Sequence, residues 1–398
     1  MGKLVYFFFV VINAAVSSPP EIVSKDVARR PALPALTGIR TLLALGIILF
    51  HFTPPHLEVL SPIIGNAFVF VGCFFLISGF ILAYNYSDRA ATLVSRDFWV
   101  ARFSRLYPVY LLVLVVSLSM LGDEWHARSH AEFWKGLVLT PLLLQGWSPD
   151  LATFWNTVAW TLSAEVLLYA AFPWMIRTWA VRGAWLNTPR RLALLVVGLW
   201  MVGLVPHLTY QLANPDHLGS PADRYTSTYL IRLLKFTPLP YVCTFLAGVA
   251  LGKLQLVWEI SLRRRLALAA VALALLGVFF YSLSDRVPYI LMHGGLMTPL
   301  FAALILGLSG PHAISRVFSW KPLLLLGETT YCLYLLHFNV YVLLHRWKVL
   351  DRLHLVSLDP WISYVVLFAA GLAAFHFVEK PARRLILSRM GRAKRVAA

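Results

Sequence analysis

The sequence predicts an all-α integral membrane protein with about ten transmembrane helices and both termini in the cytoplasm. Three observations support this fold class. The 398 residues are 59% hydrophobic and only 13% charged, which is far more apolar than a soluble domain. Apolar runs long enough to cross a bilayer recur along the chain. Most basic residues fall in every second connection between these runs, as the positive-inside rule predicts for cytoplasmic loops.

The expected helices follow one another along the chain at 36–54, 62–84, 106–121, 157–176, 191–207, 236–252, 266–283, 289–309, 322–345 and 360–379. With the N-terminus inside, the cytoplasmic connections hold most of the Lys and Arg residues. The formal net charge of +17 therefore has its cause in membrane topology. We expect membrane lipids as partners and no nucleic acid.

Two further apolar stretches are not counted as spans. The segment 133–147, "FWKGLVLTPLLLQGW", would place most later basic loops outside if it crossed the membrane, so we expect an outer-side re-entrant or interfacial segment. The opening run "LVYFFFVVINAAVSSPP" is too short for a span and is interpreted as an uncleaved interfacial segment. The predicted organisation is an apolar segment and basic linker at 1–33, one transmembrane domain at 34–384, and a basic cytoplasmic tail at 385–398.

The three cysteines, Cys73, Cys243 and Cys332, lie apart within apolar segments. They form no CxxC pair and have no histidine at ligand spacing. We therefore expect them to pack in the core, and we expect neither disulfides nor a metal site.

Few ionisable residues lie inside the expected spans, and each needs a partner or a function because burying a charge in a bilayer is costly. Arg40 and His51 stand eleven residues apart in "RTLLALGIILFH", which places them on one helical face about 16 Å apart. We expect His51, Glu165 and His337 in the middle to outer half of the membrane. For Arg40 the alternative is an interfacial anchor, and for each histidine it is a hydrogen bond between helices. For Glu165 a functional role is favoured.

Arg102 and Arg105 lie in the expected connection before the third helix, in "RDFWVARFSRLYPVY". Their spacing puts both guanidinium groups on one helical face at the cytoplasmic interface. Paired arginines suit phosphate recognition, and the alternative is the positive-inside bias alone.

These stretches also carry a resemblance. "LTGIRTLLALGIILFHF", "GCFFLISGFILAY", "FWVARFSRLYPVY", "WTLSAEVLLYAAFP", "YCLYLLH" and "FHFVEKPARR" occur together and in this order. From about Pro34 to Arg384 the chain resembles the acyltransferase-3 family of bacterial membrane O-acyltransferases. Two departures from the family pattern are Thr37, where an Asp is usual, and Thr41, which replaces a common Gly.

The resemblance implies roles for the residues that match the family motifs. His51 is the expected catalytic residue and matches the first-helix motif together with Arg40. Arg102 and Arg105 match a motif associated with the acyl-coenzyme A donor, and we expect Arg40, Arg102 and Arg105 to bind the phosphates of that donor. Glu165 matches the acidic residue of the tryptophan-to-glutamate motif, and we expect it to orient or charge the His51 imidazole. The expected supporting residues are Ser78, which with Gly79 matches the serine-glycine pair, His337 and Tyr334. Expected acceptor contacts are Trp147, Trp155 and Trp160, whose alternative is the aromatic belt of the membrane interface.

The implied activity is O-acyl transfer, with acetyl as the expected group. The donor would be cytosolic acyl-CoA, with no tightly bound cofactor, and the acceptor a hydroxyl of an extracytoplasmic saccharide or saccharide-lipid such as exopolysaccharide or lipopolysaccharide. His51 would act as a general base or would carry the acyl group covalently. The expected location is the bacterial cytoplasmic (inner) membrane, near polysaccharide-synthesis proteins. The alternatives are a proton-coupled transporter or flippase of a saccharide-lipid, and a sensor or assembly partner.

Overall fold

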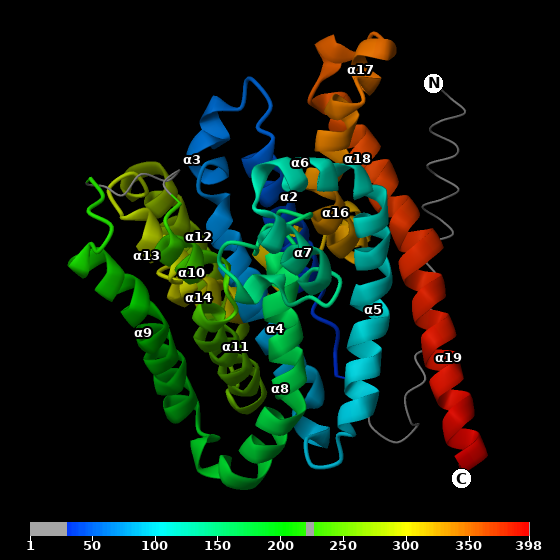
Figure 1. Ribbon diagram of the computed structural model, residues 1–398. Coiled ribbons are helices and arrows are strands. Elements are labelled where there is room, and N and C mark those ends of the chain that lie inside the picture. The colour runs from blue at the N-terminus through cyan, green and yellow to red at the C-terminus, as the bar shows by residue number, and fades with distance from the viewer. Residues whose placement is uncertain (1–29, 220–226, 398) are drawn as a thin grey trace.

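The computed structural model describes residues 30–219 and 227–397. Nearly all of the predicted N-terminal segment 1–33 therefore lies outside the described residues. Within these ranges the chain is helical and contains no strand. Figure 1 shows the long helices arranged side by side as a bundle, with short helices and loops at the ends. The all-α membrane fold is confirmed.

Each of the ten predicted spans coincides with helical structure. The long helices are α2 (Pro34–His51), α4 (Phe70–Tyr86), α5 (Ser95–Val116), α8 (Trp160–Arg182), α9 (Pro189–Ala213), α11 (Leu239–Val257), α12 (Leu262–Val278), α14 (Thr298–Leu308), α16 (Lys321–Arg346), α18 (Trp361–Ala374) and α19 (Lys380–Ala397). The shorter helices are α3 (Ser61–Ile64), α6 (Leu121–Ala127), α7 (His130–Leu139), α10 (Tyr229–Phe236), α13 (Tyr289–His293), α15 (Ala313–Phe318) and α17 (Val349–Arg352). A π-helical turn, η9 (Phe375–Glu379), joins α18 to α19 without a break.

Eight helical segments of the described chain are long and apolar enough to cross a membrane. They include α2, α4, α5, α9 and α12, and the segments formed by α10 with α11, by α13 with α14, and by α18 with α19. The helices α8 and α16 have 23 and 26 residues, which at 1.5 Å per residue also suffices to span a bilayer. They are less apolar because they carry several of the polar residues described below. The total of ten crossings and the cytoplasmic termini stay predictions.

Several predicted helix boundaries differ from the structure, and two of the differences concern site residues. The helix α5 begins at Ser95, eleven residues before the predicted 106, so Arg102 and Arg105 lie inside a helix and not in a connection. The helix α2 ends at His51 and not at 54, because Pro54 and Pro55 follow and disfavour helical backbone in the residue before them. His51 is therefore the last residue of its helix.

The predicted re-entrant segment 133–147 contains most of α7, which at ten residues is about 15 Å long and too short to cross a bilayer. The irregular chain that follows is buried against the bundle. The amide of Asn156 donates to the carbonyl of Leu335, near the middle of α16, at 3.2 Å, and Gln145 donates to the carbonyl of Ala159 at the same distance. The position of this segment relative to the membrane stays a prediction.

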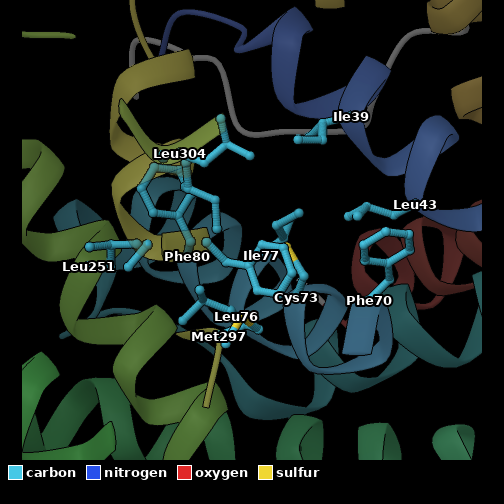
Figure 2. Packing of buried hydrophobic residues seen from close by; sticks show 14 of the residues in the cluster. Ile39, Leu43, Phe70, Cys73, Leu76, Ile77, Phe80, Leu251, Met297 and Leu304 are labelled. Atoms are coloured by element: carbon cyan, nitrogen blue, oxygen red, sulfur yellow. The ribbon is translucent and has the colours of Figure 1, made fainter. Parts of the chain in front are cut away.

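The core that positions the site lies where α4 crosses α11. A Cβ atom on Gly79 would lie 2.2 Å from the Phe245 carbonyl oxygen, and one on Gly248 would lie 2.1 Å from that of Leu76, so glycine alone permits this approach. Figure 2 shows the buried side chains around the crossing, with Phe80 of α4 near Leu251 of α11 and Leu304 of α14, and with Cys73 near Ile77 on the same helix. The opposite face of α4 borders a cavity.

Candidate functional site

A cavity of about 150 Å³ lies inside the bundle, bordered by α2, α4, α5, α8 and α16. Of the four ionisable site residues that the sequence places within the spans, Arg40 and Glu165 line it, whereas His51 and His337 do not. The predicted site residues in its lining are Arg40, Ser78, Arg102, Arg105, Glu165 and Tyr334. Segments from five different helices thus bring these side chains to one place.

Three guanidinium groups give the cavity a net positive charge. Arg40 comes from the second turn of α2, whereas Arg102 and Arg105 come from consecutive turns of α5. Glu165 is the carboxylate among the lining residues. Arg40 makes no hydrogen bond or ion pair within the described residues, although the charges of Arg105 and Glu165 act on it. A cavity with this excess of cationic donors is suited to an anionic ligand.

Arg102 is held by aromatic residues. Its Nη2 donates to the hydroxyl of Tyr86 at 3.1 Å. The guanidinium carbon lies 5.4 Å from the ring centre of Phe98 and 5.9 Å from that of Tyr169, within the range of cation–π attraction. The Nε atom is buried and has no partner among the described residues. This arrangement fixes the guanidinium plane and leaves donor capacity for a ligand.

Arg105 is paired with a carboxylate that the sequence analysis did not assign to the site. Its Nε lies 3.7 Å from Oε1 of Glu379, which is only 4% exposed. The thiol of Cys332 donates to the other carboxylate oxygen of Glu379 at 3.2 Å. An acidic residue in the apolar run "FHFVEKPARR" was the available signal, since a carboxylate at that depth requires a partner.

Glu165 faces the cavity and accepts a hydrogen bond from Tyr169, one turn further along α8. Because Tyr169 uses its proton on this carboxylate, the Ser78 hydroxyl is the donor in its 3.2 Å contact with the Tyr169 oxygen. The expected contact of Glu165 with His51 does not form in the described chain. Glu165 therefore belongs to the arginine-lined side of the site, together with Tyr169, which the sequence analysis had missed.

His51 instead lies beside His337, with ring centres 5.2 Å apart. His337 is fully buried, and its Nδ1 lies 2.6 Å from the carbonyl oxygen of Tyr334. A carbonyl oxygen only accepts, so this contact places the proton of a neutral His337 on Nδ1 and leaves a lone pair on Nε2. Nε2 is buried and has no partner in the described part of the chain. It is available to accept a hydrogen bond.

Tyr334 separates this histidine pair from the cavity. Its side chain lines the cavity, and its hydroxyl lies 3.3 Å from that of Thr161 on α8. His337 follows one turn later on α16, with its ring centre 5.7 Å from that of Tyr334. The site thus has two compartments, one with three arginines and one with two histidines, on either side of a single aromatic side chain.

The three tryptophans do not form the expected open lip. Trp155 and Trp160 are 7% and 6% exposed, whereas Trp147 is 45% exposed. The indole of Trp155 donates to the carbonyl of Ser117, and Trp160 packs against Phe236 and Tyr241. Two of the three therefore have structural partners inside the bundle and no free ring face for a sugar.

Comparison with known proteins identifies the fold family. A family model described as an acyltransferase domain, Acyl_transf_3, matches residues 33–375. The chain belongs to the acyltransferase-3 family. The match contains both compartments of the site, apart from Glu379, which lies four residues beyond its end.

Curated members of the acyltransferase-3 family give more specific similarities. The chain is 31% identical to Acyltransferase MdmB of Streptomyces mycarofaciens over 180 residues, which are 42% of this chain and 44% of that protein. It is 23% identical to Peptidoglycan O-acetyltransferase OatA of Listeria monocytogenes over 89% of this chain and 56% of that protein. For O-acetyltransferase OatA of Staphylococcus aureus the identity is 24%, over 88% of this chain and 57% of that protein. The chain spans about half the length of these curated relatives. No solved structure matches the chain.

Proposed function

We propose that this acyltransferase-3 protein transfers a short acyl group, in our expectation acetyl, from cytosolic acyl-CoA to a hydroxyl of an extracytoplasmic saccharide or saccharide-lipid. The observation that carries the proposal is the pairing of an arginine-lined cavity with a histidine pair one helical turn beyond it. Relatives named as O-acetyltransferases, one of them for peptidoglycan, support the reaction class and the acceptor class.

The cavity supports acyl-CoA as the donor. Arg40, Arg102 and Arg105 offer the phosphates of coenzyme A several charge-assisted hydrogen bonds, which a neutral donor would not need. The thin pantetheine arm would then extend toward His51, which lies about 16 Å from Arg40 along α2. The preference for a short acyl group rests on the relatives named as O-acetyltransferases.

The histidine pair supplies the base. His51 would take the proton of the acceptor hydroxyl while the hydroxyl oxygen forms a bond to the acyl carbonyl carbon. The carbon–sulfur bond then breaks, and the thiolate of coenzyme A receives the proton from the imidazolium. His337, with its lone pair on Nε2, would accept an N–H of His51 and direct the other ring nitrogen toward the acceptor. A covalent acyl-His51 relay uses the same groups.

Glu165 would act from the donor compartment. Its carboxylate holds Tyr169 and partly balances the charges of Arg40 and Arg102. We expect the bacterial cytoplasmic membrane as the location, because acyl-CoA is cytosolic and the proposed acceptor lies outside the cytoplasm.

The experiment that tests this function measures the transfer of radiolabelled acetyl from acetyl-CoA to the saccharide fraction of membrane vesicles. His51→Ala should lower transfer about 10²–10⁴-fold, because removing a general base typically has that effect. His126→Ala, which changes an exposed histidine at the end of α6, is the matched control and should leave transfer unchanged. Normal transfer by a well-expressed His51→Ala protein would contradict the assignment. Movement of a saccharide-lipid across the membrane without acetyl-CoA would instead favour a transporter.

A further inference from the structure

Glu379 is a buried carboxylate behind the cavity that the proposed reaction leaves without a role. Its two oxygens contact two different helices. Oε1 lies 3.7 Å from Nε of Arg105 on α5, and Oε2 accepts the 3.2 Å hydrogen bond from the Cys332 thiol on α16. The charges of Arg40 and Arg383 also act on it. Because Glu379 is only 4% exposed and its two oxygens have separate partners, its carboxylate has a fixed position.

The local backbone is what directs this carboxylate toward α5. Glu379 is the last residue of the π-helical turn η9, at the point where α18 continues into α19. A π-helical turn contains one extra residue, which rotates the chain after it by about 100° relative to a regular α-helix. Without η9 the carboxylate of Glu379 would leave the face that packs against α5. Such turns within helices are frequent at functional sites.

The contact with Glu379 uses the inner nitrogen of the Arg105 guanidinium. Nη1 and Nη2 make no hydrogen bond to any described residue, although Arg105 lines the cavity. An arginine held through Nε presents both terminal nitrogens as a planar fork. That fork matches two oxygens of one phosphate group.

We propose that Glu379 is a positioning residue for the donor, which fixes Arg105 through Nε so that Nη1 and Nη2 face a phosphate group of acyl-CoA. The inference rests on the proposed function and deepens it by assigning a residue to donor binding. Glu379 also offsets the mutual repulsion of Arg40 and Arg105, which share the cavity. Because Glu379 lies behind Arg105, its removal should affect donor affinity more than the chemical step.

The test compares Glu379→Gln with two other single variants. In Glu379→Gln the neutral amide no longer holds the guanidinium, so the acetyl-CoA concentration for half-maximal transfer should rise about 10-fold or more, whereas the maximal rate should change less than about 3-fold. Glu379→Asp keeps the charge and should restore part of the affinity. Glu328→Gln removes an exposed carboxylate from α16 and should match the wild type. A drop in maximal rate at an unchanged donor requirement would overturn the proposal.

A double-mutant cycle separates positioning from a general structural role. If Glu379 acts through Arg105, then Glu379→Gln should have no further effect on the donor requirement in an Arg105→Gln protein. Additive effects would contradict the inference. If the single Glu379→Gln protein is too unstable to purify, Glu379→Asp takes its place in the cycle, and its smaller effect on the donor requirement should likewise vanish in an Arg105→Gln protein.

Binding of coenzyme A, measured as a rise in the melting temperature of the purified protein, distinguishes failure of the proposed function from failure of the role assigned to Glu379. If the wild type neither binds coenzyme A nor transfers acetyl, the proposed function fails. If the wild type does both and Glu379→Gln binds coenzyme A equally well, only the role of Glu379 fails. The expected result is stabilisation of the wild type and of Glu328→Gln, with a clearly smaller shift for Glu379→Gln at the same concentration.

Discussion

The crossing of α4 and α11 should set both the stability of the bundle and the geometry of the site. Ser78 and Gly79 are neighbours on α4, so their directions differ by about 100° around the helix. Ser78 lines the cavity and contacts Tyr169, whereas Gly79 lies against the backbone of α11 at Phe245. The substitution Gly79→Ala therefore perturbs the packing directly behind the cavity wall.

The size of the effect follows from the distances at this crossing. The new Cβ would lie 2.2 Å from the Phe245 carbonyl oxygen and 2.9 Å from the Val249 nitrogen, whereas ordinary contacts begin at 3.4 Å. Both close atoms belong to backbone, so no side chain can turn aside, and the helices must separate by roughly 1 Å. Overpacking of this kind costs about 1–3 kcal/mol in the free energy of unfolding. A shift of about 1 Å at Ser78 can also lower the reaction rate about 100-fold.

The assay combines thermal unfolding of the protein in detergent with acetyl transfer in vesicles. Gly72→Ala, on the same helix, is the matched control because a Cβ there meets no atom within 4 Å. We expect Gly79→Ala to unfold at a lower temperature than Gly72→Ala and to lose most of its activity. If the two variants were equally stable and equally active, the close crossing at Gly79 would not be what holds the cavity wall in place.

Two further predictions concern the donor and the topology. Arg102→Gln should raise the donor concentration needed for half-maximal transfer about 10-fold or more, since a charged hydrogen bond is worth roughly 1.5–3 kcal/mol. Arg102→Lys should restore donor binding only in part, because lysine lacks the planar fork. An unchanged donor requirement would assign Arg102 a structural role. Single cysteines at exposed Thr92 and Val356, in a chain whose native cysteines are alanine, should react with membrane-impermeant reagents from the cytoplasmic and the outer side respectively. Outer labelling at Thr92 would overturn the predicted orientation.

The spans could be predicted from the sequence because insertion into lipid demands long apolar segments, and these are visible without tertiary information. The start of α5 was missed because "SRDFWVARFSR" is too polar to be taken for lipid-facing helix, although the fold buries part of it against α8 and α19. The gathering of Arg40, Arg102 and Arg105 was expected as a donor site, whereas the presence of Glu165 among them was not.

The partners within the site could not be predicted. Glu165 and His51 were expected to be in contact because both lie at a similar depth in the membrane. Depth, however, does not determine the direction in which a side chain points from its helix. Tyr334 lies between the cavity and the histidines, and the pairing of Arg105 with Glu379 depends on a π-helical turn far along the chain. Contacts of this kind depend on helix rotation, which apolar periodicity does not fix in helices that are hydrophobic on most sides.

The charge of the cavity also matters for the membrane as an insulator. A cavity inside a membrane protein would dissipate the ion gradients across the membrane if protons or metal cations could pass through it from one side to the other. Arg40, Arg102 and Arg105 repel cations from the cavity, much as an arginine in a narrow pore blocks their conduction. Tyr334 and Thr161 obstruct the way onward to the histidines. The side chains suited to an anionic donor thus also oppose the leakage of cations across the membrane.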